Sequence, residues 1–542
     1  MGLWKLQKII KSKLAGSRRM IAATAVIGGM FIGFNLTSMS AIIATAQYKC
    51  RYGDQGNDLV TGQCRDPGPW LQGTIMAAMP GGAWLSAICS AWILDGYSPK
   101  LEIQYIVGFW ISGCMFVTFS VNAPMLIVGR FINGISVAMF SAQLPDYVSD
   151  ISPPSVRGRL IGMYQWAVTC GMAIMFFVCF GCSFIHHEAA FRLPWGLQLI
   201  PAVLILLGLH ILPENPRWLA QMDRWQEVRE VLTLIHGRGD FCAPIIKRET
   251  DALIEAVRLD KINADMPWSE LMEPNMINRI HIGIFTQIWS QLSGMNVMTY
   301  YVTYVFAMAG LSDLASCGAQ FIIYAAMSVP GWIWQDRMGR RLTMLVGAFL
   351  MCFSMSLNAG LFAIYSRPAT DSDHFGTSAI SMVVRGPPAR GIIASTYLFV
   401  ASYASTWGRA SWIYPLGLYP LRARGKAVAL STSANWSFDF AVACFTPVAF
   451  ATITWKTYVL FAIFCGSMFI HCFFLFPETA NKSSEEVAAI FEDDGPGSIK
   501  YIGTPAWKTR NDGHAAPQRE NNVVDPETNP SPTAGSNQPN WG

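Results

Sequence analysis

The stretch PENPRWL, residues 213–219, opens a polar segment that divides the chain into two similar halves. On each side of this segment, which extends to Asn278, lie six apolar runs of about 20 residues, the length that crosses a bilayer as a helix. The runs before it lie near residues 20–45, 73–94, 103–121, 124–147, 160–184 and 193–212. The runs after it lie near residues 280–304, 315–335, 342–365, 391–415, 426–451 and 455–476. The sequence therefore predicts an all-α membrane protein with 12 transmembrane helices in two six-helix bundles.

The composition agrees with lipid as the main solvent. Of the 542 residues, 52% are hydrophobic and 14% are charged, whereas a soluble globular protein carries about 25% charged residues. The net charge of +4 is small and gives no sign of a nucleic-acid partner. The sequence has neither zinc-ligand spacing nor a phosphate-binding glycine loop, so we expect no enzyme, no metal and no other cofactor.

The basic residues of the loops set the expected orientation. They gather at the N-terminus, at Arg157 and Arg159, in the central loop, at Arg337, Arg340 and Arg341, and at Arg422, Arg424 and Lys426. Positive loops face the cytoplasm, so both termini are predicted to be cytoplasmic. The expected parts are a basic N-terminus (1–19), a first bundle (20–212), a cytoplasmic helical loop (213–278), a second bundle (279–477) and a largely disordered cytoplasmic tail (478–542).

Two smaller features concern the loops. In the central loop, the segments that begin at Trp225 and Glu249 have helical apolar spacing, which predicts short amphipathic helices under the bundles. Cys50 and Cys64 bracket a polar loop that we place outside the cell, where a disulfide between them is an open possibility.

Several short motifs follow one another along the chain. They are Gly129-Arg130 with Gly134, Tyr147-Val-Ser-Asp150, Pro154, Arg157-Gly158, Pro213-Glu-Asn-Pro-Arg-Trp-Leu219, Gln291-Leu-Ser-Gly-Met-Asn296 with Tyr300-Tyr301, Asp336-Arg-Met-Gly-Arg-Arg341 and Pro477-Glu-Thr479. Taken in this order, the motifs resemble those of the sugar porter family of the major facilitator superfamily, and of its fungal branch in particular. The resemblance covers about residues 20–490 and implies the major facilitator fold. A weak internal repeat, in which Arg157-Gly-Arg is echoed by Arg422-Ala-Arg, agrees with two related halves.

The resemblance also implies which residues contact a sugar and which form ion-pair latches. The implied substrate-binding residues are Gln165, Gln287, Gln291, Asn296, Tyr324, Trp412, Asn435 and Asp439. An amide offers both a donor and an acceptor to a hydroxylated ligand, although the same amides could instead bond helix to helix. The implied gating residues are Asp95, Arg130, Asp150, Arg157, Glu214, Arg217, Asp336, Arg337, Arg340, Arg341, Arg409 and Glu478.

Some positions depart from the family pattern. Asn35 stands where proton-coupled members carry an Asp, and Gly417 stands where the family has a Glu. Tyr324 and Asp439 each replace an expected Asn. A charge inside the membrane needs a partner, so we hypothesise that Arg409 pairs with Asp439. The pair could be a structural salt bridge or could recognise a charged substrate, and Asp439 could instead have taken over proton coupling.

The favoured function is a monomeric plasma-membrane carrier that moves a hexose, a pentose or a related solute by alternating access. Because Asn35 cannot release a proton, facilitated diffusion is favoured over proton symport. The alternatives are a carrier of a non-sugar or charged metabolite, including export of a secondary metabolite, and a sugar sensor that does not transport. The expected partners are the small solute and the lipid bilayer.

Overall fold

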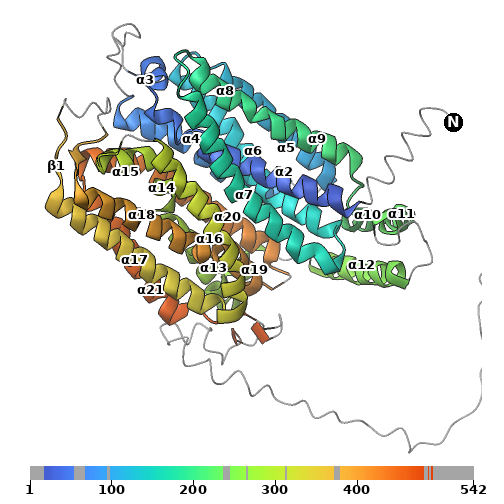
Figure 1. Ribbon diagram of the computed structural model, residues 1–542. Coiled ribbons are helices and arrows are strands. Elements are labelled where there is room, and N and C mark those ends of the chain that lie inside the picture. The colour runs from blue at the N-terminus through green and yellow to red at the C-terminus, as the bar shows by residue number, and fades with distance from the viewer. Residues whose placement is uncertain are drawn as a thin grey trace, which may run out of the picture.

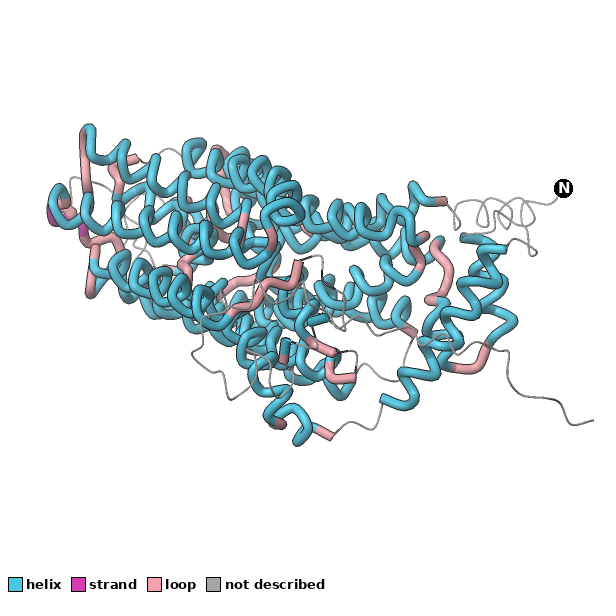
Figure 2. Tube along the Cα trace, turned by 90° about the horizontal axis from the view of Figure 1, so that it is seen from below, coloured by secondary structure: helices cyan, strands magenta, loops and turns pink. Residues whose placement is uncertain are grey.

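Helices make up nearly all of the computed structural model (Figures 1 and 2). The structure describes residues 17–53, 67–93, 98–235, 244–263, 267–311, 314–370, 379–420, 422–480, 482, 486–487 and 490–491. The N-terminal bundle consists of α2 (Arg18–Thr37), α4 (Pro69–Ile93), α5 (Pro99–Thr118), α6 (Ala123–Asp150), α7 (Pro154–Cys182), α8 (Ala189–Leu197) and α9 (Leu199–Ile211). After α2 come the short helices η1 (Ile42–Ala44) and α3 (Ala46–Tyr52).

The C-terminal bundle repeats this plan with more interruptions. It consists of α13 (Pro274–Leu292), α14 (Met295–Tyr300), α15 (Val302–Met308), α16 (Leu314–Met338), α17 (Arg340–Tyr365), α18 (Pro387–Ser405), α19 (Trp407–Leu418), α20 (Arg424–Thr452) and α21 (Lys456–Leu475). Each of the 12 apolar runs of the sequence falls on one of these helices or on a consecutive group of them. The predicted all-α fold in two bundles is therefore confirmed.

Four helices link the bundles, and the first three of them lie together at one end of the molecule (Figure 1). The four are α10 (Pro216–Gln221), α11 (Trp225–Ile235), α12 (Pro244–Asn263) and η2 (Trp268–Met272). Leu219, Val228, Leu232, Ile246 and Val257 form a small apolar core among them. Both predicted amphipathic segments are helices, α11 and α12. We call this end of the molecule the loop face.

The opposite end carries α3 and two strands of two residues each, β1 (Arg367–Pro368) and β2 (Met382–Val383), which pair antiparallel (Figure 1). We call it the hairpin face. Here Cys50 is disulfide-bonded, while Cys64 lies outside the described residues. Phe491, in the segment predicted as a disordered tail, is fully buried, and the Arg279 guanidinium lies 4.9 Å from the centre of its ring.

Eight helical segments within the described residues are long and apolar enough to cross a membrane by themselves. They are Arg18–Ala44, Pro99–Thr118, Ala123–Asp150, Val156–Cys182, Ala189–Ile211, Leu314–Gln335, Arg340–Tyr365 and Lys456–Leu475. The other four predicted spans correspond to α4, α13–α15, α18–α19 and α20. Three of these four carry most of the polar side chains implied to bind substrate, and these side chains lower the mean hydropathy of the spans.

Two of the spans are broken near their middle. α13 and α14 are separated at Gly294, whose φ of +90° is a left-handed conformation that suits glycine. α18 and α19 are separated at Thr406, whose carbonyl accepts from the Ala410 amide at the start of α19 (3.3 Å) and also from Gln335 Nε2 (2.8 Å). Because hydrocarbon offers no hydrogen bonds, the backbone groups at such a break must find partners within the protein.

The two bundles meet mainly where α4 lies along α20 and where α7 lies along α16. They are also bonded at the hairpin face, where Ser40 Oγ donates to the Thr299 carbonyl (2.6 Å) and Thr303 Oγ1 donates to the Ser40 carbonyl (3.2 Å). These bonds join the segment after α2 to α14 and α15. The structure therefore shows the two bundles connected at the hairpin face.

Glycines allow the close approach of α4 and α6. A Cβ added at Gly134 would lie 1.9 Å from the Met79 carbonyl oxygen, and one added at Gly82 would lie 2.0 Å from the Phe131 carbonyl oxygen. These neighbours are backbone atoms, so they can move away only if a helix moves. Membrane helices that approach each other this closely need small residues where they cross.

We predict that Gly134→Ala destabilises the protein by about 2 kcal/mol, because the added methyl group separates α4 from α6. Gly360 is the matched control, since it also lies in a long helix but an added Cβ there meets nothing within 4 Å. Gly360→Ala should leave the stability unchanged or raise it slightly. Thermal unfolding of the purified variants measures both effects, and equal melting temperatures for the two would contradict the prediction.

Candidate functional site

A buried polar cluster connects α13, α14 and α20. Asn296 Nδ2, in α14, donates to Asp439 Oδ1 of α20 (2.6 Å) and also to Gln291 Oε1 at the end of α13. The hydroxyl of Tyr300 donates to Asp439 Oδ2 (3.1 Å). Asp439 is only 2% exposed. Three of the residues implied to bind substrate therefore meet in one place, joined there by Tyr300.

A second pair of amides connects α13, α19 and α20. Asn435 Nδ2 donates to Gln287 Oε1 (2.7 Å), and Gln287 Nε2 donates to the Ser411 carbonyl (2.9 Å). Both amides are almost completely buried. These bonds agree with the alternative that such amides bond helix to helix, because the hydrogen-bonding groups of Gln287 and Asn435 already have partners within the protein.

Aromatic groups lie beside these amides. The Tyr403 hydroxyl bonds to Ser290 Oγ (2.8 Å), and the rings of Tyr324 and Tyr403 lie 6.2 Å apart between their centroids. Trp412, on α19, is 38% exposed. An aromatic face of this kind can stack on the apolar side of a sugar ring.

Gln165 comes from the other bundle. It lies half-buried on α7, and within the described residues its amide has no hydrogen-bond partner. The indole of the next residue, Trp166, donates to the Ala325 carbonyl of α16 (3.3 Å), which places this part of α7 at the contact between the bundles. A ligand that reached the Gln165 amide would therefore displace no hydrogen bond of the described residues.

The structure does not contain the predicted salt bridge between Arg409 and Asp439. Both carboxylate oxygens of Asp439 accept from uncharged groups, and no ion pair joins the two residues within the described part of the chain. The physical reason is the break at Gly294, after which α14 packs against α20 and brings its own donors to Asp439. Arg409, partly buried in α19, has contacts of its own.

Arg130 also differs from its predicted role as an ion-pair residue. It is buried in the part of α6 nearer the hairpin face, and its guanidinium donates to the carbonyls of Ile75 (2.8 Å) and Met76 (3.5 Å) in α4. Tyr48, Tyr300 and Tyr301 lie close enough to interact with it electrostatically. Carbonyl oxygens and tyrosines, rather than a carboxylate, surround this cation.

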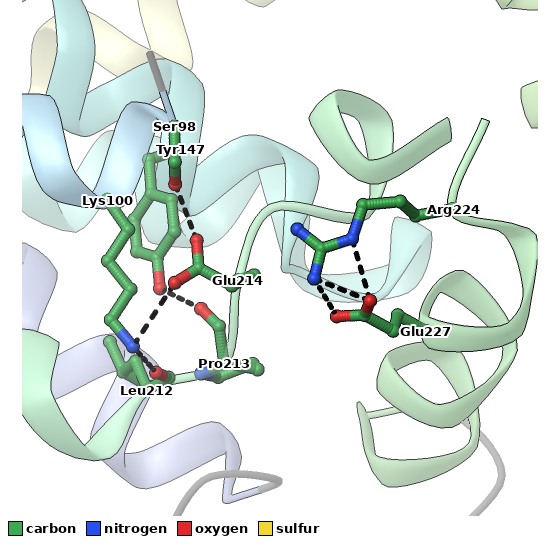
Figure 3. A network of polar contacts seen from close by, with 8 residues as sticks. All are labelled: Ser98, Lys100, Tyr147, Leu212, Pro213, Glu214, Arg224 and Glu227. Carbon is green, nitrogen blue, oxygen red and sulfur yellow. Dashed lines mark hydrogen bonds and ion pairs between the residues drawn. The ribbon is translucent and has the colours of Figure 1, made fainter. Parts of the chain in front are cut away.

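Glu214 is the centre of a polar network at the loop face of the N-terminal bundle (Figure 3). Its Oε2 accepts from the hydroxyl of Ser98 (2.5 Å), and its Oε1 lies 3.8 Å from Lys100 Nζ. Lys100 also donates to the Leu212 carbonyl (2.7 Å), while the Tyr147 hydroxyl donates to the Pro213 carbonyl (2.6 Å). The network joins the start of α5 to the end of α9. Asp95, predicted to belong here, lies outside the described residues.

A neighbouring cleft connects the N-terminal bundle to the linking helices. Asn215 caps α10 and donates through Nδ2 to Asp150 Oδ2 (2.8 Å). The cleft is lined by Asp150, Arg157 and Arg217 together with Glu249 of α12. Three predicted gating residues are therefore together at this end of α6 and α7.

The matching network of the C-terminal bundle is built on Glu478. Its Oε1 accepts from the backbone amides of Arg340 (3.0 Å), Thr479 and Ala480 (both 2.9 Å), and its Oε2 accepts from the amide of Arg341 (3.0 Å). A carboxylate at the start of α17 satisfies amides that have no partner in the helix and interacts favourably with the helix dipole. The predicted latch exists, but backbone amides form it.

The arginines of this latch have other partners. Arg340 Nη1 donates to Thr479 Oγ1 (3.3 Å), and Arg341 Nη2 donates to the Phe473 carbonyl (2.8 Å). Arg337 is exposed at the end of α16. The side chain of Asp336 lies outside the described part of the structure.

Sequence reasoning missed several residues of these networks. Tyr300 was noted only as part of a motif, and its bond to Asp439 spans 139 positions. Asn215 and Ser98 have the sequence signal of helix caps, since each precedes a proline that begins a helix. In the described residues no group of three or more His, Cys, Asp or Glu side chains could hold a metal ion.

Comparisons with known proteins agree with this architecture. A family model described as "Sugar (and other) transporter" matches residues 21–491. The MFS glucose transporter mfs1 of Aspergillus flavus is 38% identical over 495 residues, which cover 89% of this chain and 90% of the relative. The high-affinity glucose transporter of Kluyveromyces lactis is 34% identical, with 91% of this chain and 86% of the relative covered.

Among solved structures, the inward-open conformation of the xylose transporter XylE from E. coli superposes with a TM-score of 0.69. The match covers 87% of this chain and 99% of that one at 20% identity. At this identity the likeness supports the fold alone. The relatives are named as transporters rather than enzymes, so the role is transport.

We predict that Glu478→Gln destabilises the protein by about 1–3 kcal/mol, because a side-chain NH₂ group replaces one of the acceptors and leaves a backbone amide unsatisfied. Glu227→Gln is the matched control, since Glu227 forms an exposed pair with Arg224, which contributes little (Figure 3). Thermal unfolding of the purified proteins compares the two variants. If Glu478→Gln unfolds at the same temperature as Glu227→Gln, the latch does not stabilise this state.

Proposed function

The chain belongs to the sugar transporter family of the major facilitator superfamily, and on that premise we propose that it carries a neutral monosaccharide, glucose or a related hexose, by alternating access. The relatives that are 34–38% identical are named glucose transporters. Carriage of a non-sugar metabolite and a non-transporting sensor role have no such support.

The amide of Gln165 is the observation that carries the proposal. It projects from the N-terminal bundle, whereas Gln291, Asn296 and Trp412 belong to the C-terminal bundle. A ligand held by residues of both bundles lies where alternating access needs it, near the interface about which the bundles rock. Amides and an indole suit a hydroxylated, uncharged ring.

The networks at the loop face hold each bundle together as a unit. Glu214 ties α5 to the end of α9 within the N-terminal bundle, and Glu478 ties α17 to the segment after α21 within the C-terminal bundle. The bonds of Ser40 at the hairpin face, in contrast, join the two bundles to each other. The proposed transport cycle is therefore a rocking of two rigid bundles that makes and breaks contacts between them.

The proposed location is the plasma membrane, with the loop face in the cytoplasm. The support is the excess of arginine and lysine in loops at this face, such as Arg157, Arg337 and Arg422. The start of α2 and the end of α21 both lie at the loop face, which supports the proposal that both termini are cytoplasmic.

The first test is uptake of labelled glucose by a yeast strain that lacks its own hexose carriers. Gln165→Ala should raise the KM by about tenfold, because it removes one hydrogen bond to the sugar. It should leave thermal stability unchanged, since Gln165 has no partner within the described residues. Asn358→Ala is the control: this buried amide donates to Thr396 Oγ1 (3.4 Å) between α17 and α18 and should leave the KM unchanged. No uptake by wild-type protein at the cell surface would refute the proposal.

The orientation has its own test. Epitope tags at the N-terminus and after Gly542 should be hidden from antibody in intact cells, whereas a tag inserted between β1 and β2 should be accessible. Permeabilised cells, in which all three tags should be labelled, provide the control. Labelling of either terminal tag in intact cells would reverse the assigned orientation.

A further inference from the structure

Asp439 is an acidic side chain in the middle of a membrane span. It lies near the midpoint of α20 (Arg424–Thr452) and is 2% exposed. The other described acids of the spans, such as Glu102, Asp146 and Asp150, lie within about the first or last turn and a half of their helices. An ionisable group at this depth is costly as an ion unless a cation pairs with it, and such groups usually mark ion or proton pathways.

The groups that face Asp439 are uncharged. Asn296 and Tyr300 donate to its two oxygens, and Tyr301 and Tyr403 lie within electrostatic reach. The Tyr301 hydroxyl donates to the Ala443 carbonyl (2.8 Å), and the Tyr403 hydroxyl is bonded to Ser290. No described cation makes an ion pair with this carboxylate.

The remaining charged groups on the helices packed against α20 are engaged elsewhere. α4 contains no acidic or basic residue in its sequence. In α13, Arg279 contacts Phe491, and the ring of His281 lies 5.2 Å from that of His471 in α21. Arg409 of α19 has contacts of its own. Asp439 can therefore lower the cost of its burial by binding a proton.

Protonation of Asp439 would change the hydrogen bonds of the sugar site. A carboxylate accepts from both Asn296 and Tyr300, whereas a carboxylic acid has one donor and fewer acceptor positions. The Tyr300 hydroxyl can reverse its role and accept, or Asn296 can leave Asp439. Asn296 is also bonded to Gln291, so a proton on Asp439 alters the donors that are available to a sugar.

The same residues connect Asp439 to the closed hairpin face. Tyr300 follows Thr299, whose carbonyl accepts the Ser40 bond between the bundles. Arg130, in the N-terminal bundle, interacts electrostatically with Tyr300. Tyr300 of α14 therefore interacts with both Arg130 and Asp439. Neutralising Asp439 changes one of these two interactions, next to the bond that joins the bundles.

From this geometry we propose that Asp439 is a proton-binding site linked to sugar binding, so that the carrier moves a proton together with its sugar. A proton from the solution on one side forms an O–H bond with the carboxylate, and that bond breaks when the site opens to the other side. Asn35 cannot carry out this step. The inference rests on the proposed sugar transport, and it replaces the expectation of facilitated diffusion.

The experiment uses the full-length protein in liposomes with a trapped pH dye. An inward glucose gradient should acidify the lumen with wild-type protein. Asp439→Asn should abolish the acidification, while glucose counterflow, which needs no net proton movement, measures any separate loss of sugar binding, and Asp439→Glu should restore part of the acidification. Asp251→Asn, at an exposed acid on α12, is the control and should behave as wild type. Acidification by Asp439→Asn, or net glucose uptake by wild-type protein without acidification, would overturn the inference.

Binding measurements give a second readout. If one proton is linked to sugar binding, the Kd for glucose should change by up to about tenfold per pH unit in wild-type protein. In Asp439→Asn it should be constant between acidic and neutral pH. A pH-independent Kd in the wild type would contradict the linkage even if glucose is transported.

A third measurement separates failure of the proton site from failure of the sugar function. The infrared absorption of a protonated carboxyl group, recorded without sugar over the same pH range, should titrate in wild-type protein and be missing from Asp439→Asn. If this signal is present while glucose is neither bound nor carried, the proposed cargo is wrong and the proton site stands. If it is absent, Asp439 does not bind a proton.

Discussion

The structure depends on one constraint: inside a bilayer, every polar group of the backbone must find its partner within the protein. Continuous helices satisfy this for most of the backbone. Where α18 gives way to α19, the Thr406 carbonyl accepts from the Ala410 amide and also from the Gln335 side chain. In the polar cluster, the side chains of Asn296, Gln291 and Asp439 are bonded to one another. The polar centre of the protein is therefore held together by its own hydrogen bonds.

The two bundles are closed at the loop face by related contacts. In each bundle, a glutamate that follows the last helix contacts the start of the third span of the same bundle. Glu478 meets the backbone amides at the start of α17, where Gly339 leaves room, since a Cβ there would lie 2.5 Å from Glu478 Oε2. α5 begins with Pro99, which has no amide hydrogen, and Glu214 instead uses Ser98 and Lys100. The internal repeat seen in the sequence thus has a physical counterpart with different donors.

Much of the fold could be predicted from the sequence because hydrophobic length is a strong signal in a membrane protein. The run near 342–365, for example, coincides with α17 (Arg340–Tyr365). Side-chain partners were harder to predict. The predicted pairing of Arg409 with Asp439 was wrong. The length of an apolar run does not reveal that the chain bends at Gly294, and this bend lets Asn296 of α14 reach Asp439 on α20. Arg130 could not be assigned either, since its acceptors are carbonyls that no residue pattern reveals.

The shared amide of Asn296 has a consequence for the affinity of the carrier. Both of its hydrogens are already used, one on Asp439 and one on Gln291. If Asn296 contacts the cargo, as the proposed function implies, the cargo must exchange one set of hydrogen bonds for another. Such an exchange limits how tightly the cargo is held and favours its release on the far side.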